Sequence, residues 1–146
     1  MAVTTAPASA DTITRLRLVV MRLSRLLRQQ SADELSPTLT STLSTVERRG
    51  PLTLGELAAA ERVQPPSMTR AVARLEERGL VTRVPDPVDR RTARVSISAT
   101  GSKTLAAARR RKNAYLAERL TTLTAEERGS LERALPLLER LVGDQL

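Results

Sequence analysis

Hydrophobic residues recur every three or four positions through most of the chain, which is the spacing of one face of an α-helix. Over 11–30 this spacing predicts an amphipathic helix, and a second helix is expected over 36–49. Pro37 suits the first turn of that second helix, and Gly50-Pro51 is a suitable stop. The chain is therefore expected to begin with two helices, each with one apolar face.

Two closely spaced helices are predicted next. Thr53 and Glu56 have the spacing of a capping box, in which each side chain satisfies a backbone N–H at the helix start, and this short helix is expected to end at Ala60. After a turn, the second helix opens with two prolines, which are tolerated where the N–H groups have no intrahelical acceptor. It is expected over 65–78 and to stop at Gly79, the residue type that best adopts the left-handed cap conformation.

The second of these helices has two different faces. One face is apolar, and the adjacent stripe is polar and basic. A helix held by a short preceding helix, with such a stripe near its N-terminus, has the geometry of a helix-turn-helix recognition element. An ordinary amphipathic helix with solvated arginines would show the same pattern. The apolar residues are Met68, Ala71, Val72 and Leu75, and the stripe is Ser67, Arg70, Arg74 and Arg78.

A β-hairpin is predicted directly after this helix. Strands are expected over 80–84 and 92–98, joined by a loop rich in Pro, Asp and Arg. In the second strand Val95 and Ile97 are expected to face inward and Arg94 outward. Such a hairpin would form a wing, whose arginines suit a narrow minor groove, although a solvated loop could equally pair its own charges. The charged residues expected at the tip are Asp86, Asp89, Arg90 and Arg91.

The C-terminal part predicts two further helices. Ser98 suits the N-cap of a long helix that ends near 122, and Thr124 with Glu127 repeats the capping box before a final helix. The first and last helices are strongly apolar on one side, and a chain of this length has little core left to cover them. We expect them to pair in a symmetric homodimer, with a monomeric helical bundle as the alternative. The expected dimerisation residues are Leu16, Val20, Leu23, Leu131, Leu135, Leu138, Leu141 and Val142.

The charge distribution points to an anionic partner. Lys and Arg number 24 against 16 Asp and Glu, a formal net charge of +8. The excess is concentrated over 85–112, where there are eight basic and two acidic residues. Tyr115 is the one aromatic residue, so the stacking platform of single-strand and RNA binders is missing. Double-stranded DNA is therefore the favoured partner.

The composition also excludes most enzyme mechanisms. The chain has neither cysteine nor histidine, which rules out thiolate or imidazole metal sites, a Ser-His-Asp triad and a cysteine nucleophile. We expect no enzymatic activity, no cofactor and no metal site. The N-terminal segment does not resemble a signal peptide, and no apolar run reaches the length of a membrane span. A cytoplasmic, nucleoid-associated protein without a membrane partner is expected.

Two local patterns resemble the MarR family of bacterial transcription regulators. PPSMTRAVARLEERGLVTR at 65–83 is similar to the family's recognition helix and first wing strand, and DPVDRRTARVSISATG at 86–101 is similar to its wing. Gln64 departs from the pattern, because the family often has a hydroxyl cap there. The resemblance extends over about 11–144 and implies a mainly α fold with a small β-hairpin wing, an α+β winged helix-turn-helix.

The resemblance implies a division of the single domain at 1–146. The segments 11–35 and 113–146 would hold the dimerisation helices. A winged helix-turn-helix region would occupy 36–100, and a long connecting helix would occupy 99–122.

The resemblance also implies roles for individual residues. Pro66, Ser67, Thr69 and Arg70 would lie at the major groove, with the Arg70 guanidinium matching the acceptors of guanine, and Arg74 would meet phosphate. Arg90 would enter the minor groove while Asp89 pairs with Arg91, although the two arginines could exchange roles. The implied protein is a ligand-responsive repressor that binds a pseudo-palindromic operator as a homodimer, with a small-molecule effector of unspecified identity. The alternative is a winged-helix module for protein or RNA contacts.

Overall fold

The computed structural model describes residues 8–30 and 35–143. Parts of the expected dimerisation segments, at 31–34 and 144–146, lie outside the described residues. Within the described ranges the chain forms six helices and three short strands. The elements are α1 (Ala10–Gln29), α2 (Pro37–Arg49), β1 (Leu52–Thr53), α3 (Leu54–Glu61), α4 (Pro65–Glu77), β2 (Val81–Pro85), β3 (Ala93–Ile97), α5 (Ala99–Leu120) and α6 (Ala125–Val142).

Local sequence determines where these helices begin. Both predicted capping boxes are confirmed, with Thr53 and Glu56 at α3 and Thr124 and Glu127 at α6 bonding each other's backbone N–H groups. Ser98 accepts from the backbone N–H of Gly101 at the start of α5, as expected of an N-cap. Gln64 makes no side-chain cap at α4, which opens with prolines instead. These starts need no tertiary partner, which is why the sequence predicts them.

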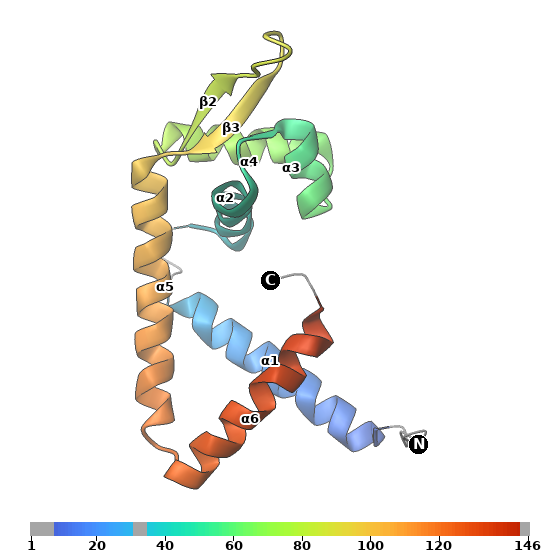
Figure 1. The fold of residues 1–146 in the computed structure, drawn as a ribbon, viewed down its shortest axis with the longest axis vertical. Coiled ribbons are helices and arrows are strands. Elements are labelled where there is room, and N and C mark those ends of the chain that lie inside the picture. The colour runs from blue at the N-terminus through green and yellow to red at the C-terminus, as the bar shows by residue number, and fades with distance from the viewer. Residues whose placement is uncertain (1–7, 31–34, 144–146) are drawn as a thin grey trace.

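The molecule has two ends joined by one long helix (Figure 1). The three strands, α2, α3 and α4 gather around the N-terminal end of α5, and α1 and α6 lie toward its other end. None of the described helices is both long and apolar enough to cross a membrane.

The hydrophobic core lies in the winged-helix end alone. Side chains from α2, α3, α4, the sheet and the first turns of α5 form one buried cluster, whereas no residue of α1 or α6 is buried in the described structure. Burial of such side chains from water is the main force that holds these elements together. The core includes Leu43, Val46, Leu57, Met68, Val72, Leu75, Val81, Val95 and Leu105.

The sheet has three antiparallel strands in the order β1-β3-β2. The predicted hairpin is present, with Val81 paired to Ile97 and Pro85 to Ala93, and Val95 is buried as expected while Ile97 is only half-buried. Strand β1 was not predicted, because a two-residue strand is too short to show alternation. By pairing with the far side of β3, β1 anchors the wing to the segment that opens α3.

A close backbone approach joins α5 to the end of α4. Gly79 has the predicted left-handed conformation, with φ of 67°, and its carbonyl accepts from the Ser98 hydroxyl at 2.6 Å. A Cβ atom on Gly101 would lie 2.1 Å from the Leu80 carbonyl oxygen, so only glycine fits at this contact. Helix α4, the wing and α5 are therefore held together at one point.

Candidate nucleic-acid interface

The helix-turn-helix consists of α3, a short turn and α4. Arg62 in this turn takes the left-handed conformation, with φ of 53°. Glu61, the last residue of α3, accepts hydrogen bonds from the hydroxyls of Ser41 at 2.6 Å and Thr45 at 2.5 Å. These two bonds tie the end of α3 to α2, so the turn before α4 has a defined position.

One face of α4 packs on the core, and the other is open to solvent. Met68, Ala71, Val72 and Leu75 are buried as expected. Arg78, which was predicted on this open side, is exposed at the C-cap. Five further side chains of the open side, which we call the α4 stripe, are also all exposed. The stripe consists of Pro66, Ser67, Thr69, Arg70 and Arg74.

The polar groups of the α4 stripe differ in how far they are already bonded. Within 8–30 and 35–143, neither Arg70 nor Arg74 forms an ion pair, and the Ser67 hydroxyl forms no hydrogen bond. The Thr69 hydroxyl, in contrast, donates to the Pro65 carbonyl oxygen at 3.0 Å. Two unpaired guanidinium groups on one exposed helix face suit an anionic partner.

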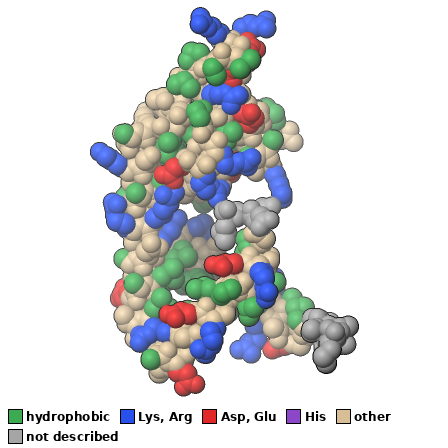
Figure 2. All heavy atoms as spheres, viewed as in Figure 1, with side chains coloured by type: hydrophobic (Ala, Val, Ile, Leu, Met, Phe, Trp, Pro, Cys, Tyr) green, Lys and Arg blue, Asp and Glu red, His purple; other side chains and the backbone are tan. Residues whose placement is uncertain are grey.

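The wing tip is shaped by Asp89. Its carboxylate accepts from the Arg91 backbone N–H at 3.1 Å and from the Arg91 guanidinium at 3.3 Å, so the expected pairing of these two residues is present. Arg90 is exposed and has no ion pair within the described part of the chain. Figure 2 shows basic side chains projecting from the wing at one extremity of the molecule.

Asp86 does not lie at the tip, and that prediction is wrong. It is 5% exposed at the base of the wing loop, where Oδ1 accepts the backbone N–H groups of Val88 at 2.7 Å and Asp89 at 2.9 Å. An aspartate that bonds the backbone two and three residues further on is typical of a turn. The pattern Asp-Pro-x-Asp was therefore the available signal for this role.

Arg94 does not simply face outward, which corrects a second prediction. Its guanidinium donates to the Asp86 carboxylate, to Glu56 Oε2 at 3.4 Å and to the Pro51 carbonyl oxygen at 3.2 Å. We call the group of Asp86, Arg94 and Glu56 the wing clamp. Because Glu56 also caps α3, the wing clamp ties the wing loop and β3 to the start of the helix-turn-helix.

The wing clamp shifts the pKa of each of its three ionisable groups in the direction that favours the charged form. The backbone N–H groups of Asp89 and Val88, followed by the Arg94 hydrogen bond, lower the pKa of Asp86 from 3.8 to about 2. The backbone N–H of Thr53 lowers the pKa of Glu56, and the hydrogen bond to Asp86 raises the pKa of Arg94. All three groups are therefore held in their charged forms.

Two residues of the basic run at 109–112 form contacts with other helices of the same chain. Arg109 forms an ion pair with Glu47 of α2, and Arg111 Nε donates to the Gln30 carbonyl oxygen at the end of α1 at 3.2 Å. These contacts hold α5 against α1 and α2. Two members of the run are therefore already engaged in contacts within the fold.

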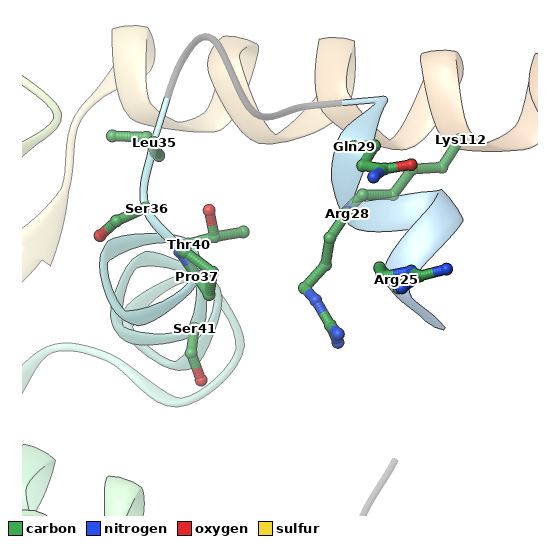
Figure 3. Close-up of a pocket in the computed structure, with 9 residues that line it drawn as sticks. All are labelled: Arg25, Arg28, Gln29, Leu35, Ser36, Pro37, Thr40, Ser41 and Lys112. Atoms are coloured by element: carbon green, nitrogen blue, oxygen red, sulfur yellow. The ribbon is translucent and has the colours of Figure 1, made fainter. Parts of the chain in front are cut away.

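A cavity of about 450 Å³ lies where α1, α2 and α5 meet. Figure 3 shows Arg25, Arg28 and Lys112 on one side of it and the first turns of α2 on the other. The α2 side includes Pro37, Thr40 and Ser41. The cavity is of small-molecule size, and among the described residues its charged lining is cationic.

A helix-turn-helix followed directly by a β-hairpin wing defines the winged-helix class, and the comparisons agree. The MarR family model matches residues 35–93. A helix-turn-helix-type transcriptional regulator of Mycobacterium bovis is 45% identical over 130 residues, covering 88% of this chain and 91% of that protein. The chain belongs to the MarR family of transcriptional regulators, so the predicted family and fold class are confirmed, and the family is not one of enzymes.

Solved structures show the same fold. A crystal structure of a Pseudomonas aeruginosa transcriptional regulator has a TM-score of 0.83 and 32% identity, covering 94% of this chain and 99% of that one. A Staphylococcus aureus MepR variant bound to an oligodeoxyribonucleotide has a TM-score of 0.71 at 17% identity, covering 90% and 96% of the two chains. At that identity the second likeness concerns the fold alone.

The wing clamp predicts the acid titration of Asp86. Because its folded pKa is below the ordinary value, the clamp contributes stability fully above about pH 4, and this contribution is lost as pH falls through about 2. In a carboxyl-detected NMR titration of the folded protein, we expect Asp86 to remain ionised at pH 3. The Asp86→Asn variant assigns the signal by its absence. A midpoint near 3.8 would contradict the clamp.

Proposed function

We infer that the protein binds a specific double-stranded DNA sequence as a homodimer and represses transcription. The observation that carries this inference is that Arg70, Arg74 and Arg90 are exposed and without ion pairs in the described structure. The wing and α4 both lie at the end of the molecule opposite α6 (Figure 1). A helix and a hairpin presented together suit a major groove and the adjacent minor groove.

Each exposed residue has a role that follows from its chemistry. Arg70 lies near the start of α4 and has the planar fork that matches guanine N7 and O6, whereas Arg74 is one turn further along and suits phosphate. Arg90 takes the minor groove, because Arg91 is engaged with Asp89. Pro66, Ser67 and Thr69 complete the surface that enters the major groove. An oligodeoxyribonucleotide is bound to the structurally similar MepR variant, which supports DNA as the ligand class.

The homodimer is supported by where the uncovered apolar surface lies. Of the fourteen large hydrophobic side chains that are exposed within the described residues, twelve are on α1 and α6. Figure 2 shows hydrophobic side chains gathered in the lower part of the molecule, where these helices lie. Of the expected dimerisation residues only Leu138 is half-buried within its own chain. An apolar surface of this extent needs a partner, and a second copy provides an identical one.

The dimer determines the form of the operator. A two-fold axis through α1 and α6 presents two copies of α4, which reach successive major grooves about 34 Å apart on a pseudo-palindromic site. We propose 36–100 as the DNA-binding region, 99–122 as the connection, and 11–35 with 113–146 as the dimerisation segments. Bound at a promoter in the nucleoid, the dimer represses by blocking access of RNA polymerase.

The cavity supports a response to a small organic anion. Arg25, Arg28 and Lys112 supply positive charge, and the cavity lies at the junction between the DNA-binding and dimerisation parts. A ligand that prefers a different angle between those parts shifts the spacing of the two α4 helices and weakens DNA binding. The shift is limited by the difference in ligand affinity between the two states.

DNA recognition is tested by selecting duplexes from a random library and measuring the affinity of variants at fixed salt. We expect Arg70→Ala to relax the preference at one base-pair position by about 1–3 kcal/mol. Arg90→Ala is expected to weaken binding to all duplexes alike. Arg110→Ala, at an exposed arginine of α5 outside the proposed dimerisation segments, is the matched control. Unchanged discrimination in Arg70→Ala removes its reading role, and failure to select any preferred duplex favours a protein- or RNA-binding module.

The dimer is tested by placing a charge in the apolar faces of α1 and α6. Val20→Asp and Leu141→Asp, at side chains 52% and 71% exposed, are expected to shift the protein from dimer to monomer in sedimentation experiments. Val88→Asp is the control, because that side chain is 94% exposed in the wing loop. A dimer that survives both substitutions would show that the interface lies elsewhere.

The ligand response is tested with benzoate and its neutral analogue benzamide. We expect benzoate to raise the melting temperature and weaken operator binding, because it pairs with the cavity cations, whereas benzamide does neither. Arg28→Gln is expected to abolish the difference. Arg22→Gln, on the same helix but outside the cavity lining, should retain it. Equal effects of the two compounds would contradict an anion site.

A further inference from the structure

Thr69 differs from the other hydroxyl residue of the α4 stripe. Its hydroxyl donates to the Pro65 carbonyl oxygen at 3.0 Å, one turn back along α4, although the side chain is exposed. Ser67 is equally exposed but forms no side-chain hydrogen bond within the described residues. The Thr69 hydroxyl therefore already donates its proton to a hydrogen bond within α4, whereas the Ser67 hydroxyl can donate its proton to a ligand.

This bond decides which chemical group Thr69 presents. A threonine hydroxyl that is turned back onto its own helix leaves the γ-methyl group as the part that is not engaged. Pro66 lies three residues earlier and is also exposed, and its ring has no hydrogen-bond donor. The Pro66 ring and the Thr69 methyl group are thus apolar parts of a surface that also carries the Ser67 hydroxyl and the Arg70 guanidinium.

Among the four bases, thymine is the one that presents a methyl group in the major groove. We propose that Thr69 reads the 5-methyl group of one thymine in each half-site of the operator. The proposal rests on the proposed function and specifies part of the operator. Adjacent Cα atoms lie about 3.8 Å apart and stacked base pairs about 3.4 Å apart. The thymine therefore lies within one or two base pairs of the guanine that Arg70 contacts.

Two matched variants separate the methyl group from the hydroxyl. Thr69→Ser keeps the hydroxyl and removes the methyl, and Thr69→Val keeps methyl groups and removes the hydroxyl. The operator selected by the wild-type protein is prepared with each thymine replaced in turn by deoxyuridine, which lacks only the 5-methyl group. Dissociation constants for all pairs are measured at one salt concentration, after circular dichroism has shown that each variant is folded.

At one thymine of each half-site, we expect the effect of the deoxyuridine replacement to depend on which residue occupies position 69, and we call this dependence a coupling. There, deoxyuridine raises the Kd of the wild-type protein and of Thr69→Val about fourfold, the effect of one buried methyl group, and leaves Thr69→Ser unchanged. The proposal is overturned if no thymine shows this coupling. It is also overturned if Thr69→Ser keeps the wild-type preference while Thr69→Val loses it, because the hydroxyl would then be the reading group.

Failure of this proposal can be told apart from failure of the proposed function. If Arg70→Ala relaxes base preference while no thymine couples to Thr69, the protein still reads DNA and only the methyl contact is wrong. If the selection returns no preferred duplex, sequence-specific binding fails, and this proposal falls with it.

Discussion

The arrangement of the winged-helix end depends on one buried carboxylate and the arginine that reaches it. Asp86 collects two backbone N–H groups of the wing loop, and Arg94 connects it to Glu56 at the start of α3. A two-stranded hairpin is marginal by itself, so its direction relative to the helix-turn-helix must come from such contacts. Strand β1 and the wing clamp together supply this direction, and they thereby position Arg90 relative to the α4 stripe.

The arginines of this protein divide into two groups by whether an acid is within reach. Arg83 is bonded to Glu76 at 3.0 Å, Arg94 to the wing clamp and Arg109 to Glu47, and these hold elements together. Arg70 and Arg90 have no such partner in the described structure. A net charge of +8 alone does not identify a contact surface, because paired arginines contribute little to an external anion. Other exposed arginines, among them Arg48, Arg49 and Arg110, also lack an ion pair in the described structure, so Arg70 and Arg90 are set apart by their position on α4 and on the wing.

The two ends of the molecule are stabilised differently. The winged-helix end has a core of its own, whereas α1 and α6 have no buried residue and leave most of their apolar side chains exposed. Between them, α5 is held by Arg109 to α2 and by Arg111 to the end of α1, and the cationic cavity lies at this junction. Within the described residues, α5 extends along both ends and so connects them (Figure 1).

The sequence by itself determined the features that depend on near neighbours. Capping boxes at Thr53 and Thr124, the proline start of α4 and the left-handed Gly79 each need only residues within a few positions, so pattern reasoning predicted them. The tertiary structure decided the rest. Strand β1, the tie from Glu61 to Thr45 and the bond from Arg94 to Pro51 join residues 16 to 43 positions apart. Periodicity shows which face of an element is polar, but the partner of a charged side chain depends on which distant segment the fold brings beside it.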